Sequence, residues 1–388
     1  IMKKRIVILG STGSIGKSTI NILKKKKKNF EVVLLTTHRN YQELYKQAKS
    51  LNVKNLIISD KKSYEILKAK NKNKKIKIYN NYVNLSKILK KKVDYTMSSI
   101  SGLQGLEPTL SLIKFTKKIA VANKEAIICG WGLIKNALIK NKTEFIPVDS
   151  EHVSSWSLIK KGENKLVDKV YITASGGPFL KLSLKKIRNV SPRKAIKHPN
   201  WSMGKKISID SSTMMNKVFE VIETQRIFNL QKSKIHILIH EKSYVHAIVQ
   251  FKNGLKKILV HDTNMVIPIF NTIYGNDDEF IKSKNLDLKN LNNLNFKFVD
   301  KKRFPLIDIL RLIPEQYSLF ETVLVSANDT LVNLFLENKI TYIDLQKKLK
   351  KFIKLKEFTK LKRRKPRNIN EIYALNEQVR LKIKSLCI

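Results

Sequence analysis

A glycine-rich turn between an apolar segment and a helical pattern constrains the fold of this chain more than any other feature. The segment RIVILG (5–10) runs into STGSIGKST, which places Gly10, Gly13 and Gly16 between a predicted strand and a predicted helix. Glycines let the backbone turn sharply and approach a pyrophosphate, whose charge the N–H groups at the helix start stabilise. An ordinary strand-to-helix turn is the alternative, because the spacing GxxGxxG differs from the commoner GxGxxG.

Strand and helix patterns alternate through the first part of the chain. Apolar runs predict strands at 30–37, 55–60 and 117–123, and helical spacing predicts helices from Ser18, from Tyr41 and across 124–139. Repeated strand–helix units imply a parallel, doubly wound sheet. We therefore expect an α/β fold with a Rossmann-like, dinucleotide-binding domain over 1–148.

The pattern changes near residue 145 and again after residue 275. Strands ending in polar or glycine-rich turns, a helical stretch over 213–228 and a strand pair at 234–240 and 244–251 indicate an α+β domain. Asn, Lys and Asp then dominate a polar segment, and apolar residues at helical spacing return beyond it. We expect a central α+β domain over 149–275, a linker over 276–300 and a small helical domain over 301–388.

The residues after the second predicted strand indicate which dinucleotide binds. A carboxylate at this place accepts hydrogen bonds from the ribose of NAD, whereas a cation pairs with the 2′-phosphate of NADP. Here the strand ends in His38, Arg39 and Asn40, and Glu31 lies at its other end. The sequence therefore favours NADP, with a solvated loop arginine as the alternative.

Two carboxylates follow the apolar run FIPV (145–148). If the strand continues through them, Asp149 and Glu151 point to the same side, and two carboxylates this close repel unless a cation or a proton lies between them. That cation is either a lysine or a Mg²⁺ or Mn²⁺ ion with a further oxygen ligand. A predicted helix over 208–223 supplies such a ligand, since Asn216, Lys217 and Glu220 share about one face.

Three further features suit an anionic, phosphorylated substrate, although each is also common as plain structure. Ser211 and Ser212 lie where we expect this helix to start, and hydroxyls beside free N–H groups suit a phosphate. The turn Ser175–Gly177 offers a second anion-binding loop. The segment KHPNWSMGKK (197–206) has no periodicity and could form a lid, with Trp201 as its apolar cover and His198 reaching an anion.

The net charge of +46 suggests a nucleic-acid partner, but the residue types argue against one. Only 11 of the 77 basic residues are arginine, whose planar fork reads phosphate better than lysine does. The lysine runs contain neither aromatic stacking residues nor a recognition helix, so we expect no specific nucleic acid. Two cysteines, Cys129 and Cys387, form no disulfide framework. Without a long apolar run or a leader-like start, we expect a cytoplasmic protein that binds no membrane.

Six motifs occur in an order that resembles a known family. They are GSTGSIG, VANKE, PVDSEH, ASGGPF, HPNWSMGKKISIDSSTMMNK and LIHEKSYVHAIV. The chain resembles 1-deoxy-D-xylulose-5-phosphate reductoisomerases from its first strand to its last helices. The resemblance implies isomerisation and reduction of 1-deoxy-D-xylulose 5-phosphate to 2-C-methyl-D-erythritol 4-phosphate, an early step toward isoprenoid precursors, with NADPH and one Mg²⁺ or Mn²⁺ per subunit.

The same resemblance implies roles for individual residues. NADPH contacts would be Thr12, Gly13, Ser14, Ile15, Arg39, Asn40, Asn123, Glu125 and Gly204. Metal ligands would be Asp149, Glu151 and Glu220, and substrate contacts would be Lys124, Ser150, Glu151, Ser175, His198, Ser211, Asn216, Lys217 and Glu220. Lys124 would offset developing negative charge, and His198 would join it and the carboxylates as catalytic residues. The resemblance also implies a homodimer braced by the helical domain, and His246 matches a family position near the active site or dimer contact.

A different NADP-dependent reductase, acting on a semialdehyde or another sugar phosphate, is the competing enzyme hypothesis. Such an enzyme would share the first domain only and would not need three carboxylates around a metal. Activity that survives a chelator would favour it.

Overall fold

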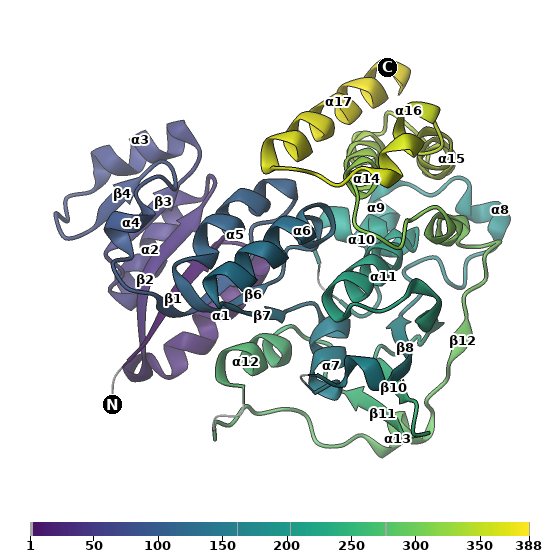
Figure 1. The fold of residues 1–388 in the computed structure, drawn as a ribbon, viewed down its shortest axis with the longest axis horizontal. Coiled ribbons are helices and arrows are strands. Elements are labelled where there is room, and N and C mark those ends of the chain that lie inside the picture. The colour runs from purple at the N-terminus through teal and green to yellow at the C-terminus, as the bar shows by residue number, and fades with distance from the viewer. Residues whose placement is uncertain (1–2, 161, 202, 276–277, 388) are drawn as a thin grey trace. The chain divides into compact units, whose positions relative to one another are not determined.

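The computed structural model describes residues 3–160, 162–201, 203–275 and 278–387, which form two compact units (Figure 1). Unit 1 contains residues 1–127, 132–149 and 265–282, and unit 2 contains residues 128–131, 150–264 and 283–388. Within the described residues, no helix is both long and apolar enough to cross a bilayer.

Unit 1 is built on a seven-stranded sheet in the order β4-β3-β2-β1-β5-β6-β7, and every strand pair is parallel. The strands are β1 (Lys4–Leu9), β2 (Phe30–Thr37), β3 (Asn55–Ile58), β4 (Lys77–Tyr79), β5 (Val93–Ser98), β6 (Thr116–Val121) and β7 (Glu144–Pro147). The chain winds outward in both directions from β1, so the order reverses between β1 and β5, where α/β proteins bind ligands beyond the carboxyl ends of the strands. The predicted α/β, doubly wound class is confirmed.

Helices connect these strands, and one comes from much later in the chain. They are α1 (Ser14–Lys25), α2 (Tyr41–Leu51), α3 (Lys61–Lys70), α4 (Leu85–Ile88), α5 (Leu106–Ile113), α6 (Lys124–Asn141) and α12 (Val266–Tyr274). Helix α12 packs on α1, the Tyr274 ring meets Phe30 edge-on at 5.8 Å, and Tyr95 and Thr272 share a 2.7 Å hydrogen bond. Residues 266–274 therefore fold with unit 1, whereas the sequence assigned them to the central domain.

Unit 2 contains a five-stranded sheet in the order β11-β10-β8-β9-β12. Its strands are β8 (Val167–Ala174), β9 (Ile235–Ile239), β10 (Val245–Phe251), β11 (Lys256–Val260) and β12 (Lys297–Phe298). The predicted strands near 234–240 and 244–251 form as β9 and β10, but their direct pairing is wrong, because β8 lies between them and bonds to both. The predicted linker 276–300 includes α13 (Leu288–Asn292) and β12, and its residues 276 and 277 lie outside the described residues.

Unit 2 also contains helices, one of which, α11, is buried along most of its length. They are α7 (Ser150–Leu158), α8 (Leu184–Ile187), α9 (Pro192–Ala195), α10 (Lys205–Ser212), α11 (Met215–Phe228), α14 (Phe320–Leu336), α15 (Tyr342–Phe352), α16 (Lys356–Thr359) and α17 (Ile369–Cys387). Short 3₁₀ turns over the chain are Lys27–Asn29, Leu103–Gly105, Glu163–Leu166, Lys232–Lys234, Pro305–Arg311 and Lys360–Arg363. Val221 and Phe228 of α11 pack with Val170, Ile172 and Val249 of the sheet. Such burial removes apolar area worth roughly 1.5–3 kcal/mol per large side chain.

The predicted C-terminal helices pack on α10 and α11 through polar as well as apolar contacts. Asn328 of α14 donates to Asp210 Oδ1 at 2.7 Å, and the Tyr342 hydroxyl donates to the Ser212 carbonyl at 2.6 Å. Burial raises the pKa of Tyr342, although the hydrogen bond to Ser212 acts in the opposite direction. The helical region is therefore continuous with unit 2 and fixes the position of α10.

Candidate active site

The glycine turn after β1 has a shape that only glycine allows at two positions. Gly10 has φ +75°, and a Cβ there would lie 2.8 Å from the Ser99 carbonyl oxygen. A Cβ on Gly16 would lie 2.3 Å from the Gly10 carbonyl oxygen, because α1 packs directly on the turn. The helix begins at Ser14 with Gly13 as its N-cap, four residues earlier than the sequence predicted. The turn and the first amides of a 12-residue helix suit a pyrophosphate.

The loop after β2 carries the predicted specificity residues at the same sheet edge. The Arg39 side chain is 76% exposed, and its Nε lies 3.5 Å from Asp60 Oδ1. Asn40 caps α2 by accepting from the Glu43 amide at 3.2 Å. The Thr12 hydroxyl shares a 2.7 Å hydrogen bond with Thr37 at the end of β2. An exposed guanidinium beside the glycine turn fits the 2′-phosphate of NADP.

The start of α6 brings three predicted residues to the carboxyl end of β6. The Asn123 side chain caps the helix by accepting from Ala126 N at 2.7 Å, and it donates to the carbonyls of Ile100 and Gly102. It therefore holds the loop after β5 as well as the helix start. Lys124 is buried and donates to Asp149 Oδ2 at 2.9 Å, and Glu125 is buried beside it.

The three predicted metal ligands converge, but they do so without the strand alternation from which the sequence prediction was made. Strand β7 ends at Pro147 and α7 begins at Ser150, so Glu151 lies in the first turn of a helix and the predicted strand alternation is wrong. Glu220 comes from α11, and Asp149 is the residue before α7. One carboxylate oxygen from each lies within 4.8 Å of the other two. Clustered carboxylate oxygens are the donors that Mg²⁺ and Mn²⁺ prefer, so the residues fit such an ion.

Lysines also neutralise this cluster, so the lysine alternative left open by the sequence is observed. Lys217 Nζ donates to Glu151 Oε1 and, at 2.6 Å, to Glu220 Oε2. Asn216 donates to the other oxygen of Glu220, and the Ser150 hydroxyl donates to Glu151 Oε2. These amide, hydroxyl and ammonium donors orient the carboxylates in a site where Glu220 is only 1% exposed.

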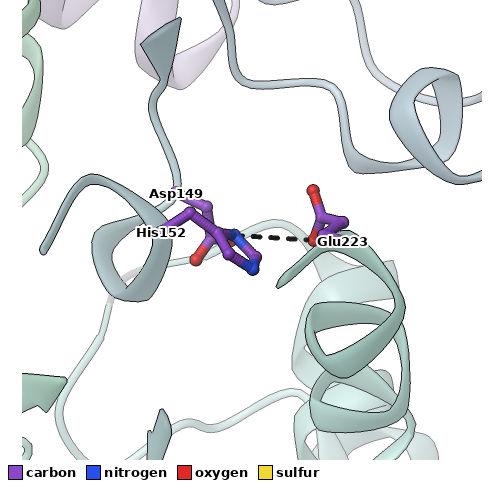
Figure 2. Close-up of side chains that lie close together, drawn as sticks. All are labelled: Asp149, His152 and Glu223. Carbon is purple, nitrogen blue, oxygen red and sulfur yellow. Dashed lines mark ion pairs between the residues drawn. The ribbon is translucent and has the colours of Figure 1, made fainter. Parts of the chain in front are cut away.

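A second group of side chains shares Asp149 with this cluster. Ligand atoms of Asp149, His152 and Glu223 lie within 4.8 Å of one another, and Figure 2 shows the His152 ring directed toward the Glu223 carboxylate. The His152 Nδ1 to Glu223 Oε2 distance is 3.8 Å. Both side chains are buried, with exposures of 0% and 1%.

The predicted anion-binding turn and His198 lie next to each other. His198 Nδ1 accepts from the Asn200 and Trp201 amides at 3.1 and 3.0 Å, so Nε2 carries the proton and donates to Ser175 Oγ at 2.9 Å. Ser175 Oγ also accepts from Gly177 N at 3.2 Å, which leaves the hydroxyl proton to donate elsewhere. Burial, and secondarily the Lys217 charge, lowers the pKa of His198 to about 4.

The predicted helix over 208–223 is broken, which moves Ser211. Met214 has φ +65° and separates α10 from α11, so Ser211 and Ser212 end α10 instead of starting a helix. The prediction that they cap a helix N-terminus is therefore wrong. Ser211 nevertheless lies against the anion-binding turn, because a Cβ on Gly177 would lie 2.9 Å from the Ser211 carbonyl oxygen. Gly204 is the N-cap of α10.

The segment predicted as a lid is anchored on the loop after β9. Asn200 Nδ2 donates to the Glu241 carbonyl at 2.6 Å and to Ser243 Oγ at 3.0 Å. The Trp201 ring meets His246 edge-on, with centroids 6.0 Å apart. His246 is buried by these contacts, and Ser202 of this segment lies outside the described residues.

Comparisons with known proteins agree over the whole chain. Family models of 1-deoxy-D-xylulose 5-phosphate reductoisomerase match residues 6–131, and models of its C-terminal domains match residues 145–228 and 261–382. The reductoisomerase of Pelagibacter ubique is 58% identical over 99% of this chain and 100% of its own length. The chain belongs to the 1-deoxy-D-xylulose 5-phosphate reductoisomerase family.

Solved structures of reductoisomerases support the same assignment. The enzyme of Zymomonas mobilis in complex with NADPH has a TM-score of 0.89 at 30% identity, covering 100% of this chain and 99% of the other. A reductoisomerase in complex with NADPH, fosmidomycin and magnesium has a TM-score of 0.89 at 29% identity, covering 98% of each chain. Because the likeness extends beyond the first domain, the hypothesis of a different reductase sharing only that domain is not favoured.

Sequence reasoning missed His152 and Glu223 in this reductoisomerase. His152 directly follows Glu151, and Glu223 lies three residues after Glu220, which is about one helical turn. The signal that could have identified them is that each is a titratable residue close in sequence to a predicted metal ligand on the same helix.

Proposed function

We propose that this chain converts 1-deoxy-D-xylulose 5-phosphate to 2-C-methyl-D-erythritol 4-phosphate, with NADPH and a divalent cation. The observation that carries the proposal is the convergence of Asp149, Glu151 and Glu220 within 4.8 Å in a chain that matches reductoisomerases throughout. Magnesium is the expected ion, and manganese, which prefers the same oxygen donors, is an alternative.

The carboxylates would hold the cation, with Asn216 and Ser150 orienting Glu220 and Glu151 through the hydrogen bonds described above. A bound divalent cation supplies Lewis-acid stabilisation to negative charge on the substrate oxygens, and NADPH supplies the hydride. Lys124, buried against Asp149, would offset negative charge that develops on the substrate.

The substrate phosphate would be held at the turn Ser175–Gly177, near Lys217. The Ser175 hydroxyl is free to donate a proton, His198 fixes its direction, and Lys217 lies near enough to influence the His198 pKa. The Ser211 backbone lies beside the same turn, and its hydroxyl would be a further donor to the phosphate. Binding energy from the phosphate, remote from the reacting carbons, can then stabilise closure of residues 197–206 over the substrate.

NADPH would bind at the carboxyl edge of the unit 1 sheet. The amides of Thr12, Ser14 and Ile15 would face the pyrophosphate in this proposal, and Gly13, whose amide donates to the Gly10 carbonyl at 3.1 Å, would contact it through the turn. Arg39 and Asn40 would face the 2′-phosphate. Asn123 and Glu125 would contact the cofactor at the start of α6, and Gly204 would contact it from unit 2.

The decisive experiment follows NADPH oxidation with 1-deoxy-D-xylulose 5-phosphate and Mg²⁺. We expect turnover in the wild type, loss of turnover with a chelator that Mg²⁺ reverses, and loss of turnover in Glu220→Gln. Glu163→Gln, a change of the same kind in a 3₁₀ turn of unit 2, is the matched control and should keep its activity. Full activity of Glu220→Gln, or full activity in chelator, would remove the metal site from the mechanism.

We also propose that the enzyme is a cytoplasmic homodimer. Strand β11 is an edge of the unit 2 sheet, and Leu255 and Ile258 beside and within it are 58% and 50% exposed. An exposed apolar edge strand is a surface that a second chain can cover. Light scattering should give about twice the mass of one chain, and a monomer at micromolar concentration would contradict the proposal.

A further inference from the structure

His152 connects the two helices that carry the proposed metal ligands of unit 2. It follows Glu151 on α7, and its Nε2 lies 3.0 Å from the Glu220 carbonyl oxygen and 3.0 Å from Thr224 Oγ1 on α11. The histidine is fully buried, so no water competes for these contacts. One side chain thus reaches from the residue next to one ligand to the backbone of the other ligand.

The surroundings of His152 determine which nitrogen carries its proton. The Glu220 carbonyl can only accept, and Thr224 donates its own hydroxyl proton to that carbonyl at 2.8 Å. Nε2 must therefore donate to α11. The other nitrogen, Nδ1, faces the Glu223 carboxylate at 3.8 Å, as the dashed line in Figure 2 shows. The Glu223 side chain lies beside the Nδ1 edge of the ring and limits rotation of the ring away from Glu220.

This link acts on a distance to which metal binding is sensitive. Mg²⁺ requires near-ideal octahedral geometry with oxygen ligands at about 2.0–2.1 Å. Catalytic constellations need to be held within about 0.5 Å of their productive geometry. Since Glu151 and Glu220 belong to different helices, a shift of α7 against α11 changes the separation of their carboxylates directly.

We propose that His152, oriented by Glu223, is a positioning residue that fixes α7 against α11 and thereby sets the spacing of Glu151 and Glu220 for the divalent cation. The proposal rests on the metal site of the proposed function. It assigns His152 no contact with substrate or metal, and it assigns Glu223 to the orientation of the imidazole. Residues in this role commonly change metal affinity by about 10–100-fold when replaced.

Two substitutions separate the link to α11 from the space that the ring fills. A glutamine amide can place a donor near the position of Nε2, whereas an asparagine amide reaches only as far as Nδ1. We therefore expect His152→Asn to weaken Mn²⁺ binding about 10–100-fold, and His152→Gln to recover most of the affinity. Glu223→Ala, which removes the side chain beside Nδ1, should weaken Mn²⁺ binding in the same direction.

The measurement is the Mn²⁺ dissociation constant of the full chain, from the electron paramagnetic resonance signal of free Mn²⁺ without substrate. The KM for Mn²⁺ should rise in parallel, and the KM for NADPH should not change. His240→Asn is the matched control, because His240 is also buried and also bonds a backbone carbonyl, that of Asn295 at 3.1 Å. It should lose thermal stability while keeping its Mn²⁺ affinity.

The outcomes distinguish failure of the positioning role of His152 from failure of the proposed metal site. Wild-type Mn²⁺ affinity in His152→Asn and Glu223→Ala, with Glu220→Gln unable to bind, would overturn the positioning role and leave the proposed function intact. Binding of Mn²⁺ by Glu220→Gln as tightly as by the wild type would overturn both. Two Mn²⁺ ions per subunit, one of them lost in His152→Asn, would make His152 a ligand and also overturn the positioning role.

Discussion

Removal of the Lys217 ammonium tests whether the carboxylate cluster is built to exchange one cation for another. In Lys217→Met the apolar stem is largely kept, but Glu151 and Glu220 lose the charge that lies between them. All three side chains are buried or nearly so, so solvent screens their repulsion poorly. We expect the variant to be unstable without metal and to be stabilised by Mg²⁺ far more than the wild type.

The size of the effect follows from the geometry. Two carboxylate charges 4.8 Å apart repel by about 3.5 kcal/mol at an effective dielectric constant of about 20. Removing one partner from a buried ion pair costs about 3–5 kcal/mol in general, in agreement with that figure. For a unit the size of unit 2, each kcal/mol corresponds to about 2–4 °C in Tm. The metal-free variant should therefore melt about 7–14 °C below the wild type.

The assay is urea unfolding followed by tryptophan fluorescence, with a chelator and then with saturating Mg²⁺. A divalent cation restores the missing positive charge. Most of the unfolding free energy lost in Lys217→Met, about 3.5 kcal/mol, should therefore return when Mg²⁺ binds. Lys165→Met, the same change at an exposed lysine of unit 2, controls for the substitution and should shift neither midpoint. An equal Mg²⁺ increment in wild type and Lys217→Met would refute the reasoning.

The remaining predictions concern the cofactor turn, cofactor choice and pH. Gly16→Ala places a Cβ 2.3 Å from the Gly10 carbonyl oxygen, so unit 1 should lose about 1–3 kcal/mol and NADPH titration should show weaker binding; unchanged binding would contradict this. Arg39→Gln should raise the dissociation constant of NADPH about 10–100-fold and leave that of NADH unchanged, and equal changes would exclude a 2′-phosphate contact. Folding lowers the pKa of His198 from 6.5 to about 4, so its contribution to stability is present above pH 6.5 and is lost as the pH falls toward 4. His198→Gln should remove about 1–2 kcal/mol of this dependence, discounted for partial exposure, and parallel unfolding curves for variant and wild type would contradict it.

Strand and helix patterns predicted the first unit well where burial is uniform. Strands β1, β2, β3 and β6 lie inside a parallel sheet and read as continuous apolar runs. Strand β4, KIY at 77–79, was missed because it is a half-exposed edge with little apolar signal. The placement of α12 in unit 1 has no local signal either, since it depends on packing against α1, more than 200 residues earlier.

The site residues were predicted better than the elements that carry them. Asp149 and Ser150 are residue types that often begin helices, so the change from β7 to α7 could have been read from the sequence. The break between α10 and α11 could not, because the left-handed position is Met214, and such positions usually carry glycine or asparagine. Site residues can thus be predicted correctly even when their secondary structure is predicted wrongly, because tertiary packing brings them together.

The spacing of charges along α11 explains how one buried helix serves both the site and the fold. Lys217, Glu220, Glu223 and Arg226 recur at every third position of a helix that is buried on nearly all sides. A buried charge must be paired, and these side chains find partners on α11 itself, as Glu220 does with Lys217, or on other elements. Lys217 pairs with Glu151 of α7, and Arg226 pairs with Glu321 of α14, whose pKa burial raises despite that cation. The same stripe therefore ties the proposed metal site to the C-terminal helices, and a charged residue at helical spacing in a buried helix is the sequence signal that identifies such connections.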